Sequence, residues 1–354
     1  MSISIETIDQ QSFDAFATQQ TNFNYLQSPE MAKLRQLRGQ AVQFLSLRQP
    51  TDANSIMVAL LSVKKTKLGK VASIDGGPLG NITKLPDYLP ALKSYLKQQN
   101  IIYCQITPHF VIKTLTQDGE IISQNPLPNL SPNQTKDLKL ARKSFSARQE
   151  FQFIKHLPEN VESLRQSYNQ SARRSLKKAE QNHLKIIEAQ EGNEDRFSKI
   201  VKILEDTAQR QNFAKKGADY YAKLKQSFGK KVKFFGVEHK IDNDPDNNSE
   251  IIAAGVFIID QNQDKTKSEL IYLFGGSKKQ FANTGAPTFL QDQAMQLAIQ
   301  KGYQKYNFYG VSGNFDGSDP VLKFKQSFRG QIEQYAPSFD LIIAPLRYRL
   351  LQIL

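Results

Sequence analysis

The chain has 354 residues, and its 47 Lys and Arg outnumber 34 Asp and Glu to give a formal net charge of +13. This charge favours a phosphate-bearing partner, such as nucleic acid, a nucleotide-sugar or an anionic membrane surface, over a cationic one. A content of 39% hydrophobic residues excludes a disordered basic tail, and a single cysteine, Cys104, excludes an internal disulfide and fits a reducing compartment.

The N-terminal stretch "MSISIETIDQQSFDAF" has early acidic residues and lacks the basic start and apolar run of a secretory signal. No segment approaches the ~20 apolar residues that a membrane span needs. We therefore expect a soluble, cytoplasmic protein.

One order of elements occurs twice along the chain, which predicts two copies of a mixed α/β unit. The first copy comprises strands at 55–65 and 70–75, the pair Gly76-Gly77, a helix at 85–100 and a strand at 101–108. The second comprises strands at 250–260 and 268–274, the pair Gly275-Gly276, a helix at 286–302 and a strand at 306–311. Each glycine pair either permits a sharp turn at positive φ or lets the backbone approach a ligand, and their matching positions favour related clefts.

The copies are separated by a Pro- and Asn-rich linker, "NPLPNLSPNQ", and by a basic helical region at 136–185 with twelve Lys or Arg against five Asp or Glu. A solvated helix face explains any one of these charges, but a polyanionic partner better explains the cluster. We expect one domain at 1–130 and a second at 131–354 that includes this region, with a return of the C-terminus to the first domain left open.

Conventional catalytic motifs are missing from the sequence. The four histidines show no metal-ligand spacing, and neither a phosphate-binding loop nor a dinucleotide fingerprint occurs. The stretch "QLRGQA" at 36–41 has the loose form of an acyl-CoA pyrophosphate loop, but we expect it at the end of a helix instead of at the start of one, so it is discounted. No cofactor and no metal are expected.

Six motifs in order resemble the FemABX family of peptidoglycan-bridge aminoacyltransferases, over nearly the whole chain. They are "YLQSPEMAKLRQ" (25–36), "IDGGPL" (74–79), "ARRSLKKAEQNHLKI" (172–186), "TAQRQNF" (207–213), "YLFGGS" (272–277) and "VLKFKQSFRG" (321–330). The resemblance implies an α/β fold of two tandem acetyltransferase-like (GNAT-like) domains, in agreement with the repeat. It also implies transfer of an amino acid from aminoacyl-tRNA to the stem peptide of a peptidoglycan precursor. Because "AKKGADYYAKL" follows "TAQRQNF" directly, the chain is similar to the armless FemX type, without a coiled-coil arm.

The resemblance also implies site residues. Lys325 and Phe324 match the Phe-Lys at the family's transfer centre, where an ammonium would stabilise the oxyanion that forms when the amine attacks the ester. The Phe324 carbonyl would orient the attacking amine. A lysine that merely flanks the end of a strand is the alternative.

The expected precursor pocket is formed by basic and aromatic side chains. The residues that match it are Arg35, Lys216, Tyr220 and either Tyr272 or Phe274 of the same strand. Thr107 stands where the family usually has Asp, so a carboxylate contact is replaced by a hydroxyl or lost, and Met31 stands where Trp is common. The residues expected to contact tRNA phosphates are Arg173, Arg174, Lys177 and Lys178.

The expected partners are aminoacyl-tRNA and either UDP-MurNAc-pentapeptide or a lipid-linked precursor, for a protein that acts as a monomer. Peripheral contact with a membrane stays open. Two other functions remain as alternatives: transfer to a different amine acceptor, which Thr107 favours, and non-catalytic RNA binding, which would need the basic region but not Phe324 and Lys325.

Overall fold

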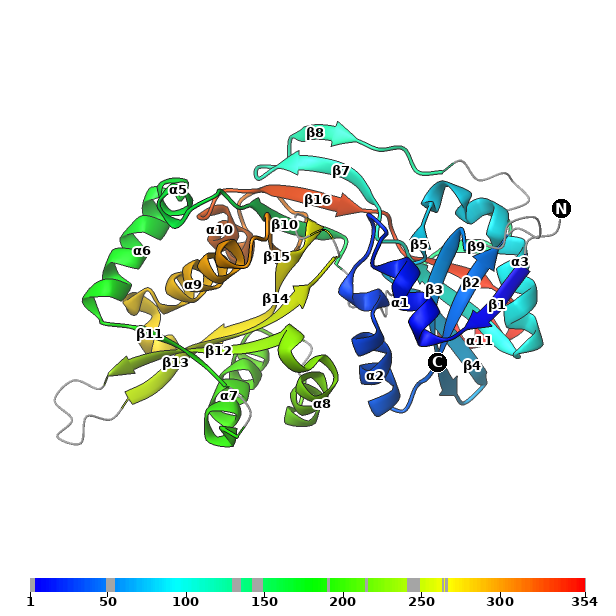
Figure 1. Ribbon diagram of the computed structural model, residues 1–354, viewed down its shortest axis with the longest axis horizontal. Helices are drawn as coiled ribbons and strands as arrows, with labels where there is room; N and C mark the ends of the chain where they lie inside the picture. The colour runs from blue at the N-terminus through cyan, green and yellow to red at the C-terminus, as the bar shows by residue number, and fades with distance from the viewer. Residues whose placement is uncertain are drawn as a thin grey trace. The chain divides into compact units, whose positions relative to one another are not determined.

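The computed structural model describes residues 4–48, 55–128, 135–141, 149–189, 192–213, 216–240, 249–262, 264 and 267–353. Its strands are β1 (Ser4–Ile8), β2 (Ala41–Arg48), β3 (Met57–Thr66), β4 (Gly69–Asp75), β5 (Leu79–Gly80), β6 (Ile101–Thr107), β7 (Val111–Thr116), β8 (Ile121–Gln124), β9 (Leu138–Leu140), β10 (Phe151–His156), β11 (Lys185–Glu188), β12 (Val232–Lys240), β13 (Ser249–Asp260), β14 (Glu269–Ser277), β15 (Lys305–Val311), β16 (Gln331–Tyr335) and β17 (Phe339–Ile342). Figure 1 shows these strands with the helices between them.

The α-helices are α1 (Gln10–Ala17), α2 (Pro29–Leu37), α3 (Leu85–Gln98), α5 (Val161–Gln166), α6 (Gln170–Gln181), α7 (Glu194–Arg210), α8 (Ala218–Phe228), α9 (Ala286–Gln300), α10 (Pro320–Gln326) and α11 (Pro345–Ile353). Short 3₁₀ turns are η1 (Tyr25–Gln27), η2 (Ile82–Lys84), η3 (Gly229–Lys231) and η5 (Lys279–Thr284). Among the described residues, no helix combines the length and the apolar character that crossing a membrane requires.

The chain forms two compact units, and the first of them is built from three separate segments. Unit 1 comprises Met1–Leu115, Ile121–Phe151 and Glu333–Leu354, and unit 2 comprises Thr116–Glu120 and Gln152–Ile332. One sheet has the order β1-β2-β3-β4-β6-β17-β9 with β5 beside β3, and the other has the order β11-β12-β13-β14-β15-β10-β16-β7-β8.

The repeat predicted from the sequence is confirmed in the topology. In unit 1, β3 pairs antiparallel with β4, and β4 pairs parallel with β6 after the crossover through α3. In unit 2, β13 pairs antiparallel with β14, and β14 pairs parallel with β15 after the crossover through α9. A parallel pair needs such a crossover, and a helix supplies it.

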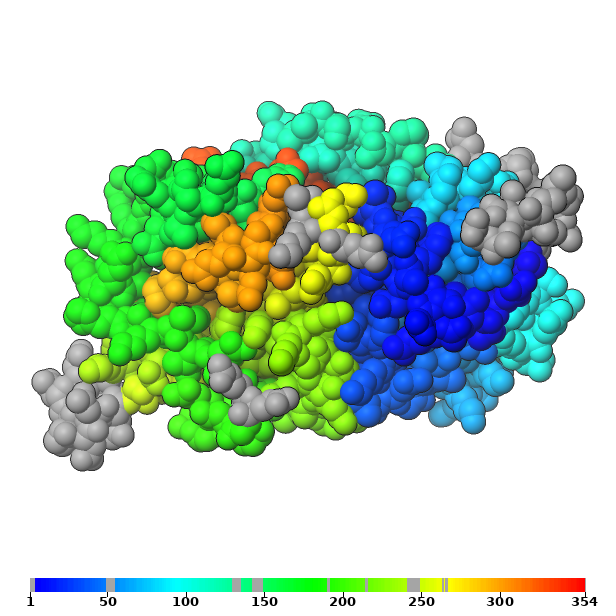
Figure 2. Space-filling view, in the orientation of Figure 1, coloured from blue at the N-terminus to red at the C-terminus, as the bar shows by residue number. Residues whose placement is uncertain are grey.

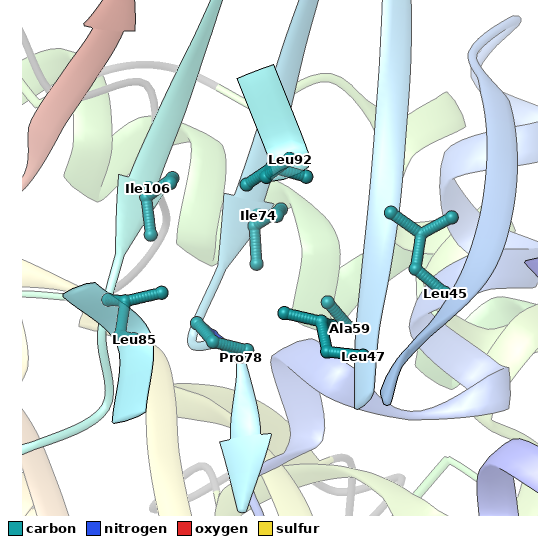
Figure 3. A pocket seen from close by; sticks show the side chains of 8 residues that line it. All are labelled: Leu45, Leu47, Ala59, Ile74, Pro78, Leu85, Leu92 and Ile106. Atoms are coloured by element: carbon teal, nitrogen blue, oxygen red, sulfur yellow. The ribbon is translucent and has the colours of Figure 1, made fainter. Parts of the chain in front are cut away.

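The core of unit 1 lies between its sheet and α3. Leu85, Leu89, Leu92 and Leu96 recur at helical spacing and are nearly fully buried against the strands. Aliphatic side chains, among them Leu45, Ile74, Leu92 and Ile106, line a small cavity in this core (Figure 3). The cavity has no polar lining group that could orient a nucleotide or an ester, so it is a packing gap in the core.

Candidate active site

The strands β14 and β15 of unit 2 separate part-way along their length. Their parallel pairs run from Glu269↔Lys305 to Ile271↔Asn307, although β14 continues to Ser277 and β15 to Val311. In unit 1 the corresponding strands β4 and β6 remain paired as far as Asp75↔Thr107, at the ends of both strands. A fork in the sheet is therefore present at this place in unit 2 and not at the matching place in unit 1.

Asn307 stands at the fork and shapes the end of β15. Its Oδ1 accepts a hydrogen bond from the Tyr309 N–H at 2.7 Å, and its Nδ2 donates to Gln152 Oε1 at 2.8 Å and Glu269 Oε1 at 3.3 Å. Tyr309 has a φ of +63°, a left-handed conformation that is strained for a residue with a large side chain. The strand bends at this residue.

Lys325 projects its ammonium group to the bent end of β15. Its Nζ donates to the Gly310 carbonyl at 2.5 Å and to the Tyr309 carbonyl at 3.4 Å, and the residue is 5% exposed. Burial lowers the pKa of Lys325 to about 7, against the opposite effect of the Asp319 carboxylate. An ammonium has three N–H donors, and these two carbonyls leave the third for a further acceptor.

Both ends of α10, the helix that carries Lys325, are held in place. At its start, the Asp319 carboxylate accepts hydrogen bonds from the N–H groups of Val321 at 2.8 Å and Leu322 at 3.1 Å. After its end, the buried Lys155 Nζ donates to the Arg329 carbonyl at 3.2 Å. Burial lowers the pKa of Lys155 to about 8. Fixed helix ends limit the positions that the Lys325 side chain can take.

Phe324 packs its ring edge-on against Phe328, with ring centres 5.4 Å apart. Its carbonyl oxygen accepts hydrogen bonds from the Ser327 N–H at 3.2 Å and the Ser327 hydroxyl at 2.6 Å. The role expected for this carbonyl, orientation of the attacking amine, would have to compete with both bonds.

Four of the expected pocket residues of unit 2 form two groups. The ring centre of Tyr220 on α8 lies 5.3 Å from Lys216 Nζ and 6.0 Å from the ring centre of Phe274 on β14. Tyr272 faces the other way, against Phe257, and burial raises the pKa of its hydroxyl. The structure therefore brings Lys216, Tyr220 and Phe274 together and places Tyr272 in the packing of the sheet.

Arg35 and Thr107 lie in unit 1, and both are buried. The Arg35 guanidinium donates to Asp75 Oδ2 at 3.0 Å and to Ser62 Oγ at 2.7 Å, and its burial lowers the pKa of this side chain. Two of its five N–H groups are used in these bonds. Thr107 is 0% exposed and shares a hydrogen bond with Ser338 at 2.9 Å, which supports loss of the family's carboxylate contact over its replacement by the hydroxyl. Met31 is also buried.

The four residues expected to contact tRNA lie on one exposed face of α6. Ala172, Leu176 and Ala179 are the buried residues of this helix, while Arg173, Arg174, Lys177 and Lys178 are all exposed. The helix is part of the visible surface of unit 2, in green in Figure 2. The structure therefore presents this basic group to solvent.

Side chains of the protein fill the space beside each glycine pair. A Cβ on Gly76 would lie 2.2 Å from Asn24 Oδ1, and one on Gly77 would lie 2.7 Å from the Gln27 amide carbon. A Cβ on Gly275 would lie 1.5 Å from the Tyr272 hydroxyl, and only Gly76 of the four has a positive φ. Close packing on the Cβ side explains why these four positions are glycine. The expectation of related clefts stays a prediction.

Several residues of the site were not singled out from the sequence. Asn307, Tyr309 and Gly310 carry no motif, because their role depends on a bend in the strand. Asp319 followed by Pro320 is a helix-start signature that would have located the first turn of α10. The stretch 36–41 spans the end of α2 and the start of β2, as expected, and in the described part of the chain no three His, Cys, Asp or Glu side chains are grouped to hold a metal ion.

Comparison with known proteins decides the family. The chain matches the FemAB family over residues 8–243 and 236–354. It belongs to this family. Aminoacyltransferase FemB of Staphylococcus epidermidis is 22% identical over 391 residues, which cover 94% of this chain and 93% of that protein. Among solved structures, FemX superposes with a TM-score of 0.76 at 16% identity, covering 99% of this chain and 100% of FemX.

A tandem GNAT protein from the clavulanic acid biosynthesis pathway superposes with a TM-score of 0.50 at 8% identity, covering 97% of this chain and 99% of that one. The family and the fold of two tandem acetyltransferase-like units expected from the sequence are therefore confirmed.

Proposed function

We propose that this FemAB-family protein transfers an aminoacyl group from aminoacyl-tRNA to the stem-peptide amine of a peptidoglycan precursor. The enzyme class is an aminoacyltransferase, in agreement with the family and with the similarity to FemB. The observation that carries the proposed chemistry is Lys325, whose buried ammonium is held by two carbonyls at the bent end of β15.

In the proposed reaction the precursor amine attacks the ester carbonyl carbon. A C–N bond forms, the C–O bond to the tRNA ribose breaks, and the amine loses one proton while the leaving ribose oxygen gains one. After the C–N bond forms and before the C–O bond breaks, negative charge develops on the carbonyl oxygen. The free N–H of Lys325 would bind that oxyanion, and one preorganised donor of this kind is worth about 10²–10³ in rate.

Substrate recognition is assigned to three groups of residues. The exposed basic face of α6 contacts the tRNA backbone. Lys216, Tyr220 and Phe274 bind the precursor, with Tyr272 behind them in the sheet. Arg35 uses its remaining N–H groups toward a precursor phosphate while Asp75 and Ser62 hold it in place. The protein works as a monomer in the cytoplasm, where charged tRNAs are available.

A transfer assay tests the proposal. Purified protein is mixed with a pool of charged tRNAs carrying labelled amino acids, and with either UDP-MurNAc-pentapeptide or a lipid-linked precursor. The expected result is a mass gain of one or more amino-acid residues on the precursor, dependent on charged tRNA. Absence of transfer to both precursors, in a preparation whose tRNA binding is intact, would refute the proposed acceptor.

Transfer to another amine is the second candidate, and the burial of Thr107 favours it, because the carboxylate usual at this position is replaced by a side chain bonded to Ser338. Labelled amino acid in a product other than a precursor, with a requirement for Lys325, would identify it. Incorporation of label into any product would exclude simple RNA binding.

A further inference from the structure

The helix α11 in unit 1 carries an exposed apolar stripe. Leu346, Leu350 and Ile353 are 77%, 52% and 83% exposed. At about 100° per residue, Leu350 and Ile353 lie within about 40° and 20° of the direction of Leu346. Three large aliphatic side chains therefore point outward along one line on the surface of unit 1.

The opposite side of α11 is firmly anchored. Tyr348 is 5% exposed, its hydroxyl donates to Asp340 Oδ2 at 2.8 Å, and its ring contacts Tyr103 edge-on with centres 5.2 Å apart. Leu351 packs against the same buried group. The helix thus has a fixed orientation, and the exposure of the stripe does not come from a loose chain end.

Basic side chains flank the stripe. By the same helical geometry, Arg347 and Arg349 lie about 100° to one side and about 60° to the other. The guanidinium of Arg347 lies near the turn between β3 and β4, since its Nη1 is 3.4 Å from where a Cβ on Gly69 would be. This turn includes Lys67, and Leu68 beside it packs against the buried side of α11.

Lys64 extends the basic group along β3. It pairs directly with Val71, so both side chains lie on the same face of the sheet, and Val71 packs in the cluster that contains Tyr348. Neither 63–70 nor 345–353 contains an acidic residue. These two segments therefore carry apolar and positive side chains and no negative charge.

We propose that α11 and the β3–β4 turn form a membrane-docking surface for an anionic lipid bilayer. An interfacial helix buries its apolar line at the boundary of the acyl chains, while flanking Lys and Arg contact acidic headgroups. Anionic lipid fits both features, whereas a nucleic acid would leave the three aliphatic side chains unused. The docking surface does not depend on the proposed transfer reaction. Taken with that reaction, it favours a lipid-linked precursor as the acceptor.

Vesicle flotation tests the docking surface with the full-length protein. Vesicles contain phosphatidylcholine alone or mixed with phosphatidylglycerol, and the wild type is expected to float only with the anionic mixture and less at high salt. Replacing Leu346, Leu350 and Ile353 together by Ser should weaken binding by about tenfold or more. Arg347→Glu with Arg349→Glu should do the same by removing the charge attraction.

Matched control variants distinguish a specific role of α11 from a general loss of exposed apolar surface or of positive charge. Ile121, Ile122 and Leu127 are also exposed, so their triple Ser variant tests any loss of apolar surface, and Lys279→Glu with Lys301→Glu tests any loss of charge. Both controls should float like the wild type. The proposal is overturned if the α11 variants bind vesicles normally, or if the Ser variant only converts a dimer to a monomer, which would make the stripe a protein contact.

Discussion

Lys325 is positioned to act as a cation. Its side chain is also buried, which disfavours the charged form. Its pKa of about 7 means that near neutral pH the ammonium and the free amine coexist. The Tyr309 and Gly310 carbonyls favour the charged form by accepting its hydrogen bonds. The charge of this donor is therefore sensitive to small changes in its surroundings.

Replacing Lys325 by Met should lower single-turnover transfer by about 10²–10³ while precursor affinity stays nearly unchanged. Lys325→Arg should also be poor, because a planar guanidinium cannot take the place of an ammonium between two carbonyls. Rapid-quench transfer and precursor titration measure the two effects. Lys323→Met, at an exposed position of the same helix, is the control, and full activity in Lys325→Met would remove the proposed role.

Asp319→Asn should shift the pH dependence of transfer. The Asp319 carboxylate raises the pKa of Lys325, so its neutralisation lowers that pKa, and the ammonium is lost at a lower pH. The decline in rate on the alkaline side should then move to lower pH. Asn also caps helices well, so the start of α10 is preserved. A single-turnover pH profile identical to that of the wild type would contradict the assigned effect.

Some site residues could be predicted from the local sequence, and others could not. The Phe-Lys in "VLKFKQSFRG" is a local signal, and the basic positions of α6 follow helical periodicity. The burial of Arg35 could not be predicted, since it depends on Asp75 and Ser62 of two neighbouring strands. The same holds for Thr107, whose partner Ser338 lies 231 residues further along the chain.

At the scale of elements, the fork between β14 and β15 distinguishes the two repeats. The periodicity of strands and helices predicted both copies, and their hairpins and crossovers agree with the structure. The fork itself could not be predicted, because the strand composition is similar in both units. It depends on Asn307, which links β15 to β10 and β14 and holds Tyr309 in the left-handed conformation.

Substitution of Tyr309 tests whether this bend positions Lys325. Tyr309→Asn and Tyr309→Val both remove the phenol ring, but Asn tolerates a positive φ and the β-branched Val does not. The Val variant should therefore transfer about tenfold more slowly than the Asn variant, a ratio that matches a strain of 1–2 kcal/mol. Equal single-turnover rates in two folded variants would show that the bend does not matter for the reaction.

The exposed face of α6 makes a prediction about salt. If Arg173, Arg174, Lys177 and Lys178 neutralise tRNA phosphates, replacing all four by Gln should weaken tRNA binding and reduce its salt slope by about 3. Filter binding over a range of salt concentrations measures both quantities. Replacing Lys64 and Lys67 by Gln provides a control. An unchanged slope in the α6 variant would place the tRNA surface elsewhere.

At the scale of the whole molecule, the two units are not consecutive in the sequence. The segment Glu333–Leu354 belongs to unit 1, where β17 lies between β6 and β9 and α11 packs beside Tyr103. The strand β17 is only four residues long, which is too short for an alternating pattern that would predict a strand from the sequence. Its neighbours in the sheet come from parts of the chain more than 190 positions earlier.

A chain that ends at residue 337, after β16 and before β17, should therefore lose the cooperative unfolding of unit 1 but keep that of unit 2. The protein has no Trp, so single substitutions Tyr95→Trp in unit 1 and Tyr303→Trp in unit 2 provide separate fluorescence reporters for urea titration. Removal of 345–354 alone, which keeps β17, should have the smaller effect. Unchanged unfolding of the unit 1 reporter in the shorter chain would show that β17 is dispensable.

The late position of β17 also has a consequence for synthesis on the ribosome. The strand β6 is made early, but its antiparallel neighbour β17 follows only after the whole of Gln152–Ile332. At about 5–20 residues per second, these roughly 180 residues take about 10–35 s to translate. During that time the edge of β6 has no β17 to pair with, and an open edge is a site of aggregation that a nascent-chain chaperone would have to cover. Unit 1 is thus completed only when β17 has left the ribosome.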